Sequence, residues 1–289
     1  MIAIDLGSNT IRFIEYDGEY WGNSYEKIVK TAESLHETKR IGENALERIL
    51  SAINEAKTKL DFVSNDIIGC ATAAMRMAEN SDSVIESIEA ATGIRFTIID
   101  AEKEANLTLN AVRYRLSKLG IEPSSFVMAD IGGGSTELIV CEGQSSRSIS
   151  FNIGIVTLSE RSNTPKKLDE SIYSFKEQIN SQRFPHTSLV LTAGTPTTIA
   201  AYLNGMDYET YDPEKINGYR LHLEDCYRVE DDLLKMDEVT RARYVGVGRE
   251  NLIIAGIRMV TAIFEALDYN EAIIIDDGLR EGIALEYFC

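Results

Sequence analysis

Two segments of the sequence share one pattern, in which an acidic residue at the end of an apolar run is followed by small polar residues. The first reads AIDLGSNTIRF and the second reads ADIGGGSTEL. Aligning Asp5 with Asp130 gives an offset of 125 residues that needs no gap through Gly18 and Gly143. Repetition at a fixed offset indicates that the chain contains an internal duplication.

The residues after each acid have the types that bind phosphate. Small side chains let a phosphate group approach the main chain closely, where backbone N–H groups can donate hydrogen bonds to it. We therefore predict phosphate contacts from both segments, although glycine and serine also form ordinary turns without a ligand. The predicted residues are Gly7, Ser8, Asn9, Thr10 and Arg12 in the first copy and Gly132, Gly133, Gly134, Ser135 and Thr136 in the second.

Asp5 and Asp130 place negative charge beside this phosphate. That arrangement is unfavourable unless a cation lies between the charges, and Mg²⁺, which takes few protein oxygens and keeps several waters, is the natural candidate. Mn²⁺ is the alternative. Neither segment is a P-loop, because no lysine follows the glycines and the next element is a strand rather than a helix. In the same alignment Arg12 occupies the position of Glu137, so the two copies present opposite charges there.

Alternating strands and helices surround both segments. In the first half we expect strands at 2–6, 11–16, 66–72 and 95–100, and helices at about 41–60, 73–79, 81–92 and 101–119. The second half repeats this order, with strands on both sides of 132–134 and at 188–194 and 271–276, and helices at about 230–238, 250–267 and 278–288. Two similar α/β halves predict a duplicated fold with a cleft between two lobes.

Charge and cysteine spacing exclude several classes of protein. The net charge of −17 disfavours binding to DNA, because DNA-binding surfaces gather Lys and Arg. No run approaches the roughly 18 apolar residues of a membrane span, and no basic region followed by an apolar run begins the chain, so we expect a cytoplasmic protein without a membrane partner. The four cysteines are widely spaced, which argues against a zinc site and for reduced thiols.

Two phosphate loops facing across a cleft are the signature of the actin-like, sugar-kinase and heat-shock-chaperone superfamily, which this sequence resembles in architecture. Within it, the chain resembles the exopolyphosphatase/guanosine pentaphosphate phosphatase family over nearly its whole length. The motifs that carry the resemblance are, in order, IDLGSNTIRF (4–13), ATAAMRMAEN (71–80), EKEA (102–105), DIGGGSTEL (130–138), AGTPTT (193–198), GREN followed by AG (248–256) and GLREG (278–282).

The resemblance implies two actin-like, ribonuclease H-like domains, each a mixed five-stranded sheet flanked by helices. Gly120 and Pro123 interrupt both the helical and the strand spacing of apolar residues just before the second copy. We therefore place domain I at 1–119 and domain II at 120–277. Family members suggest that the helix at about 278–289 packs back on domain I. Larger relatives carry further C-terminal helical domains, and this chain resembles the short, two-domain form.

The resemblance also implies catalytic roles. Glu104 matches the catalytic base, which accepts a proton from the water that attacks the terminal phosphorus. Asp5, Asp130 and Glu137 match positions associated with Mg²⁺ and the reacting phosphate. The structural alternative is that Glu102 and Glu104 are only first-turn acids favoured by the helix dipole, and Glu102 remains the reserve candidate for the base.

Three further motifs suit an anion. Arg76 lies one turn into a helix that follows a strand, where its guanidinium can grip phosphate bidentately, a surface salt bridge being the alternative. Gly194 and Thr195 stand at a helix N-terminus, which suits an anion or nucleotide, although Thr also serves as an ordinary N-cap. Arg249 and Arg280 either line the cleft or pair with neighbouring acids.

Three positions depart from the family pattern. Asn106 and Thr157 stand where arginine is common, and Asn251 stands where aspartate is common. Two of these changes remove positive charge. They leave the hydrolytic residues intact and weaken the grip expected on a long polyanion.

We therefore expect a Mg²⁺-dependent phosphohydrolase that removes the terminal phosphate from inorganic polyphosphate or guanosine pentaphosphate. Three alternatives stay open. A kinase on the same fold would transfer phosphate from ATP to an acceptor. A sensor would bind polyphosphate or guanosine tetraphosphate without turnover, and an actin-like assembly protein would form filaments. The sequence also leaves open whether the chain forms a homodimer.

Overall fold

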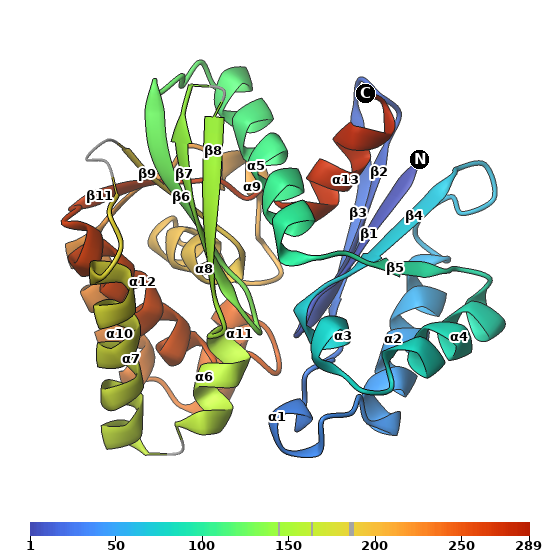
Figure 1. Ribbon diagram of the computed structural model, residues 1–289, viewed down its shortest axis with the longest axis horizontal. Coiled ribbons are helices and arrows are strands. Elements are labelled where there is room, and N and C mark those ends of the chain that lie inside the picture. The colour runs from blue at the N-terminus through green and yellow to red at the C-terminus, as the bar shows by residue number, and fades with distance from the viewer. Residues whose placement is uncertain (144, 163, 185–187) are drawn as a thin grey trace. The chain divides into compact units, whose positions relative to one another are not determined.

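The computed structural model describes residues 1–143, 145–162, 164–184 and 188–289 (Figure 1). The chain divides into two compact units, one formed by 1–111 and 278–289 and the other by 112–277. The sequence placed the boundary at 119/120, where glycine and proline end a helix. The division falls earlier because helix α5 (Ala101–Lys118) is continuous, and its second half belongs to the second unit.

The first unit is a five-stranded sheet with helices. Its strands are β1 (Ile2–Leu6), β2 (Thr10–Tyr16), β3 (Trp21–Ile28), β4 (Ile67–Ala71) and β5 (Phe96–Ile98), and its helices are α1 (Leu35–Thr38), α2 (Glu43–Ala56), α3 (Ala73–Met77), α4 (Ser81–Thr92), the start of α5 and α13 (Leu279–Tyr287). The strand order is β3-β2-β1-β4-β5. The pairs β1–β2 and β2–β3 are antiparallel, whereas β1–β4 and β4–β5 are parallel.

The second unit repeats this sheet. Its strands are β6 (Ser125–Ile131), β7 (Thr136–Glu142), β8 (Ser145–Phe151), β9 (Ser188–Thr192), β10 (Arg220–His222) and β11 (Glu271–Ile274), and its helices are the end of α5, α6 (Ile155–Arg161), α7 (Pro165–Asn180), α8 (Gly194–Leu203), α9 (Pro213–Ile216), α10 (Leu223–Lys235), α11 (Glu238–Val245) and α12 (Ile253–Leu267). The order β8-β7-β6-β9-β11 has the same directions as the first sheet. The duplicated α/β fold is therefore confirmed.

The two sheets differ in size. Among the described residues the second sheet has six strands where five were expected, because β10 pairs antiparallel with the outer side of β11. This strand has three residues and buries only Leu221, so it leaves no periodic pattern in the sequence. A mixed sheet flanked by helices is retained in both units.

Each unit has its own apolar core. In the second unit α12 is buried along most of its length and packs with α7, α8 and α10. In the first unit α13 packs on β1 and β2, and Leu279, Ile283 and Ala284 are buried there. Gly282 makes this packing possible, because a Cβ at that position would lie 2.1 Å from the carbonyl oxygen of Leu107 on α5.

Within the described ranges, no helix combines the length and the apolar character needed to cross a membrane. The four cysteines are outside disulfides, and three of them, Cys70, Cys141 and Cys226, are buried. Burial raises the pKa of the Cys70 and Cys226 thiols to about 12, which keeps them protonated. These three are packing residues, as the sequence suggested.

Candidate functional site

The repeated segment forms the same turn in both units. The Gly7 N–H donates to the Thr10 carbonyl at 3.0 Å, and the Gly132 N–H donates to the Ser135 carbonyl at 3.0 Å. These two pairs are related by the offset of 125 residues that aligns the sequences. The duplication therefore extends to individual hydrogen bonds. We call the two turns, 7–10 and 132–136, the first and second phosphate loops after the contacts predicted for them.

The carbonyl groups of both loops are occupied by neighbouring backbone. In the first loop the Ser8 carbonyl accepts from Ala32 N–H at 2.8 Å, and the Asn9 carbonyl accepts from two N–H groups, each at 2.9 Å. In the second loop the Gly132 carbonyl accepts from Ile155 N–H at 3.0 Å and the Gly133 carbonyl from Val156 N–H at 2.9 Å. The start of α6 is thus bonded directly to the second loop.

The backbone N–H groups of the same loops, in contrast to the carbonyls, are available as hydrogen-bond donors. Within the described chain, the N–H groups of Ser8, Asn9, Gly133 and Gly134 donate to no other residue. A turn whose carbonyls are engaged and whose amides remain is a concave set of donors, which suits an anion. Gly154 lets α6 approach this closely, because a Cβ there would lie 2.5–2.6 Å from the second loop's backbone.

The acid at the end of each first strand has a different neighbour in each unit. In the first sheet Asp5 lies opposite Arg12, and Arg12 lies opposite Glu26, whose carboxylate is 3.4 Å from the guanidinium. In the second sheet Asp130 lies opposite Glu137, and Glu137 accepts a hydrogen bond from Ser150 at 2.9 Å. The exchange of Arg12 for Glu137 was predicted, and its consequence is a carboxylate pair in one unit only.

The carboxylate pair of the second unit fits a divalent cation. Directly opposed residues on antiparallel strands have Cβ atoms about 4.5–5.5 Å apart, and like charges at that spacing are destabilising by themselves. Glu137 is buried, which increases this cost. Mg²⁺ needs only one or two protein carboxylates, and no set of three or more His, Cys, Asp or Glu in the described chain is arranged to hold a metal alone. Asp5 belongs to the other unit, and its metal contact stays a prediction.

Glu104 and Arg76 meet in the first unit. Arg76 Nη1 donates to Glu104 Oε2 at 2.6 Å and to the carbonyl oxygen of Ile99 at 2.8 Å. Both side chains are largely buried, with exposures of 22% for Arg76 and 14% for Glu104. The carbonyl contact fixes the guanidinium, so Glu104 is held by an anchored arginine rather than by a mobile one. Glu102, the reserve candidate, is exposed.

Burial raises the pKa of Glu104 above that of an ordinary glutamate, and the Arg76 charge and hydrogen bond pull that pKa back down. The side chain is therefore a stronger base than a typical carboxylate while remaining ionisable. In the part of the chain that is described, Arg76 Nη2 and Nε bond to no other protein group. Arg76 Nη1 therefore holds the candidate base, and Nη2 and Nε are available to bind a phosphate.

Parallel strands bring these groups to one edge of the first sheet. The first phosphate loop follows β1, Arg76 lies on α3 after β4, and Glu104 lies on α5 after β5. Because β1, β4 and β5 are parallel, their carboxyl ends lie together, which is where ligands bind in such sheets. In the second unit the loop after β6 and Gly194 after β9 share the corresponding edge. The predicted cleft between the lobes stays a prediction.

The segment at the start of α8 is strained. Ala193 has φ 75° and ψ 178°, a conformation that side-chain-bearing residues avoid and that costs of order 1–3 kcal/mol. Such outliers gather at binding and catalytic sites. The Thr195 side chain, however, packs inward, since a Cβ on Gly256 of α12 would lie 2.4 Å from its Oγ1. Any anion contact by Thr195 is thereby left to its backbone amide.

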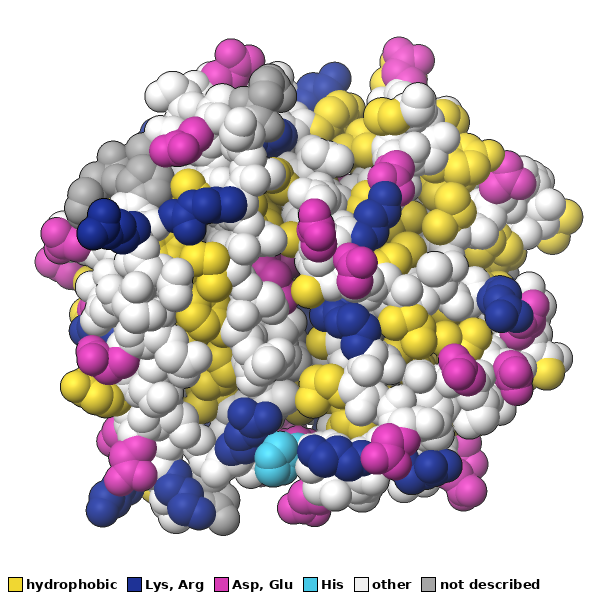
Figure 2. All heavy atoms as spheres, viewed as in Figure 1, with side chains coloured by type: hydrophobic (Ala, Val, Ile, Leu, Met, Phe, Trp, Pro, Cys, Tyr) yellow, Lys and Arg dark blue, Asp and Glu magenta, His cyan; other side chains and the backbone are white. Residues whose placement is uncertain are grey.

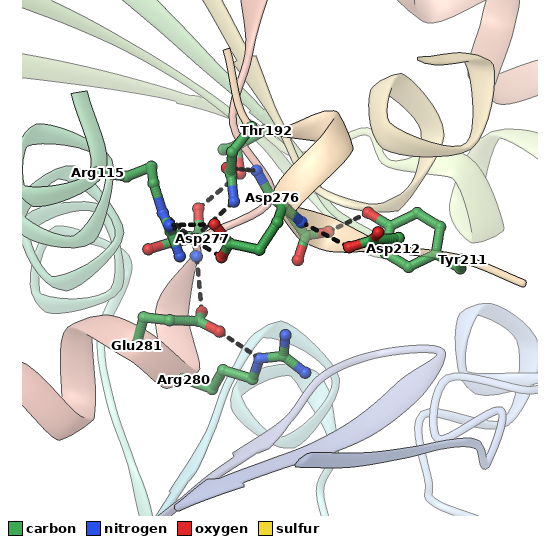
Figure 3. Close-up of polar contacts among 11 residues, drawn as sticks. Arg115, Thr192, Tyr211, Asp212, Asp276, Asp277, Arg280 and Glu281 are labelled. Carbon is green, nitrogen blue, oxygen red and sulfur yellow. Dashed lines mark hydrogen bonds and ion pairs between the residues drawn. The ribbon is translucent and has the colours of Figure 1, made fainter. Parts of the chain in front are cut away.

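A polar network that sequence reasoning missed surrounds the end of β11. Asp277 is buried and accepts from Arg115 Nε at 2.9 Å and from Asn217 Nδ2 at 3.3 Å, while its carbonyl oxygen accepts from Thr192 Oγ1 at 3.0 Å (Figure 3). Tyr211 donates to the neighbouring Asp276. The signal was the acidic pair closing the strand EAIIID, the same strand–acid pattern that marks both phosphate loops.

Arg280 and Asn251, two residues that the sequence singled out, bond to nearby acidic residues. Arg280 Nε lies 2.5 Å from Glu281 Oε1, and Glu281 also accepts from the Gly278 N–H at 2.8 Å, which caps α13. Arg280 therefore pairs with a neighbouring acid, the second of its two expected roles. Asn251 donates to Glu238 at 3.2 Å. Nothing in the structure explains Asn106.

Thr157, which stands where arginine is common in the family, has a structural role of its own. Its hydroxyl accepts from the Gly154 N–H at 2.8 Å and lies 3.4 Å from the Gly134 carbonyl oxygen. It is buried, so these contacts fix the start of α6 against the second loop.

The face in Figure 2 carries basic and acidic side chains side by side rather than a broad basic patch.

Comparison with known proteins points to one family. The model of the Ppx/GppA phosphatase family matches residues 23–288. The chain is 26% identical to a guanosine-5'-triphosphate,3'-diphosphate pyrophosphatase of Aliivibrio fischeri, over 97% of this chain and 58% of that protein. It is 25% identical to exopolyphosphatase 1 of Mycobacterium leprae, over 98% and 88%. It spans 46% of another curated relative, a bifunctional 3-dehydroquinate synthase/phosphatase of Fusobacterium nucleatum.

Solved structures agree with the sequence comparison. A Ppx/GppA family member of Aquifex aeolicus superposes with a TM-score of 0.78 at 27% identity, and the alignment covers 99% of this chain and 96% of that one. This likeness confirms the actin-like fold that the sequence suggested.

Proposed function

Because the chain belongs to the Ppx/GppA phosphatase family, we propose that it is a Mg²⁺-dependent phosphohydrolase that releases the terminal phosphate of inorganic polyphosphate or guanosine pentaphosphate. The names of its relatives support both substrates, one as an exopolyphosphatase and one as a guanosine-5'-triphosphate,3'-diphosphate pyrophosphatase. Both compounds end in a phosphoanhydride, so one hydrolytic step serves either of them.

One observation carries this proposal. The two phosphate loops repeat the same turn, and in each of them the carbonyls are engaged by backbone while amide N–H groups remain. Donors fixed in this way stabilise charge on phosphate oxygens without reorganising, which is the main protein contribution to phosphoryl transfer.

In this proposal Glu104 accepts the proton of the attacking water, and Arg76 orients Glu104 while its remaining nitrogens bind a phosphate oxygen. Asp130 and Glu137 hold the cation, with Asp5 as the predicted third acid. When bound, Mg²⁺ supplies positive charge against the oxygens that become negative as the anhydride breaks. The phosphate loops hold the end of the substrate.

The test is orthophosphate release from long-chain polyphosphate and from guanosine pentaphosphate, measured side by side with Mg²⁺, with Mn²⁺ and with EDTA. We expect release from at least one substrate, abolished by EDTA and restored by excess Mg²⁺. Metal-independent release would contradict the cation assignment. Phosphate transfer from ATP to an acceptor would favour a kinase, and tight binding of either substrate without release would favour a sensor.

A further inference from the structure

A polar groove of about 620 Å³ lies in the second unit, between β8, α6 and α7. Its floor contains Phe151 and Ile153, and one wall contains Leu158 and Arg161 of α6. The opposite wall is one face of α7. This groove has no part in the hydrolytic step described above.

The α7 wall is a continuous polar stripe. Lys167, Glu170, Ser171, Ser174 and Gln178 line the groove at positions i, i+3, i+4, i+7 and i+11, so they share one side of the helix. The stripe extends over about 16 Å along the helix axis, at about 1.5 Å per residue. The apolar residues of α7 face the core instead, and Phe175 and Ile179 are fully buried. A stripe of this length suits an extended ligand better than a single small ion.

The charge of the groove favours an anion. Arg161 and Lys167 both line it, and neither side chain forms an ion pair with a carboxylate of the described residues. The acid in the groove, Glu170, lies 3.8 Å from Lys166 Nζ, a cation outside the lining. With two cations and one acid, the lining of the groove has a net positive charge in a protein whose net charge is −17.

The groove begins beside the candidate catalytic residues. Ser150 lines the groove, and its hydroxyl donates to Glu137 at 2.9 Å. One side chain therefore connects the groove with the carboxylate pair of the second unit. An extended ligand that contacts Ser150 can therefore continue along the α7 stripe.

We propose that this groove binds the distal phosphates of an inorganic polyphosphate chain whose end lies at the phosphate loops. Arg161 and Lys167 pair with phosphate charge, and the Ser171, Ser174 and Gln178 side chains donate hydrogen bonds along the chain. This inference rests on the proposed function and selects long polyphosphate as the substrate that uses the groove.

The test compares the double variant Arg161→Gln/Lys167→Gln with the control Lys166→Gln/Lys235→Gln, which removes the same charge from exposed lysines outside the groove. For long-chain polyphosphate we expect KM to rise about tenfold in the groove variant, with kcat unchanged. For tripolyphosphate, which is too short to follow the stripe, we expect wild-type kinetics in both variants. Unchanged tripolyphosphate turnover also shows that the groove variant is folded.

Binding of end-labelled long polyphosphate in EDTA separates this inference from the proposed function. Weaker binding by the groove variant alone supports the groove. Equal KM and equal binding in wild type and both variants overturn the groove and leave the hydrolase intact. An equal effect of the control variant also overturns it, because general surface charge then explains the affinity. Failure of the wild type to bind polyphosphate overturns the groove, while pentaphosphate release would still support the hydrolase.

Discussion

The ion pair between Arg76 and Glu104 joins two roles that the sequence treats separately. The sequence suggested Arg76 as a phosphate ligand, and the family resemblance implied that Glu104 is the base, but neither gave a reason for the two side chains to touch. In the structure Arg76 Nη1 contacts both Glu104 and the Ile99 carbonyl, so the arginine positions the candidate base. A buried carboxylate needs such a partner to stay ionised.

Removing the Arg76 side chain, the ion-pair partner of Glu104, should change the pH dependence of the reaction. Burial already raises the pKa of Glu104 and Arg76 lowers it, so Arg76→Gln leaves only the raising influence. The base is then protonated up to a higher pH, and the acidic limb of the kcat profile should move to higher pH as kcat falls by roughly 10²-fold or less. The control is Arg95→Gln, which removes an exposed arginine paired with Glu89. An acidic limb at the wild-type position would show that Arg76 does not act on the base.

The position of helix α6 depends on contacts that sequence patterns do not show. Thr157 was recognised only as a departure from a family pattern, but its hydroxyl bonds the start of α6 at Gly154 and approaches the second phosphate loop. In the first unit, backbone N–H groups after β3 donate to the Ser8 and Asn9 carbonyls, as the N–H groups of Ile155 and Val156 donate to the second loop. Both loops are thus supported from outside by the segment after the third strand.

The isosteric change Thr157→Val tests this support. Valine leaves the buried Gly154 N–H without its acceptor, which costs about 1–3 kcal/mol, and the loop amides lose their alignment. We expect a lower free energy of unfolding and a lower kcat/KM for phosphate release. Thr97→Val, on an exposed position of β5, should be close to wild type in urea unfolding and in activity. Normal kcat/KM in Thr157→Val would mean that the hydroxyl does not set the loop geometry.

The contact between α13 and α5 depends on Gly282. A methyl group there would lie 2.1 Å from the Leu107 carbonyl oxygen and 2.5 Å from the carbonyl carbon, and backbone atoms cannot move aside as a side chain can. Gly282→Ala should therefore destabilise the first unit by about 1–3 kcal/mol or more in urea unfolding. Gly42→Ala is the matched control, since nothing lies within 4 Å of its added methyl group. Equal stability of the two variants would contradict this packing.

Helices and strands could be predicted where their buried residues recur at a regular spacing in the sequence. Strand β1 matches its expected range, and the break between α3 and α4 falls at Asn80 as expected, with Gly93 ending α4 in a left-handed conformation. Strand β8 was missed because four of its seven residues are serines and most of the strand is exposed. Helix α7 was missed although Thr164 and Pro165 give a clear start signal. The helix predicted at 230–238 begins earlier, at Leu223.

At the scale of the whole molecule, the duplication was the strongest prediction. The offset of 125 residues in the sequence corresponds to two sheets that share the order of five strands and to two turns with the same hydrogen bond. The acids Asp5 and Asp130 and the two loops could be predicted for the same reason, because equivalent strand ends carry them, whereas Glu104 was named through the family resemblance. Contacts made by one side chain, such as Ser150 with Glu137 or Thr195 with Gly256, have no counterpart in a sequence pattern and could not be foreseen.

We propose that this chain is a hydrolase whose general base is Glu104. The most direct measurement is kcat for phosphate release by Glu104→Gln beside Glu102→Gln, with saturating Mg²⁺ and whichever substrate the wild type cleaves. The two glutamates lie in the same first turn of α5, but Glu102 is exposed. We predict a fall in kcat of roughly 10²-fold or more for Glu104→Gln and little change for Glu102→Gln. Wild-type kcat in Glu104→Gln, or an equal loss in both variants, would contradict it.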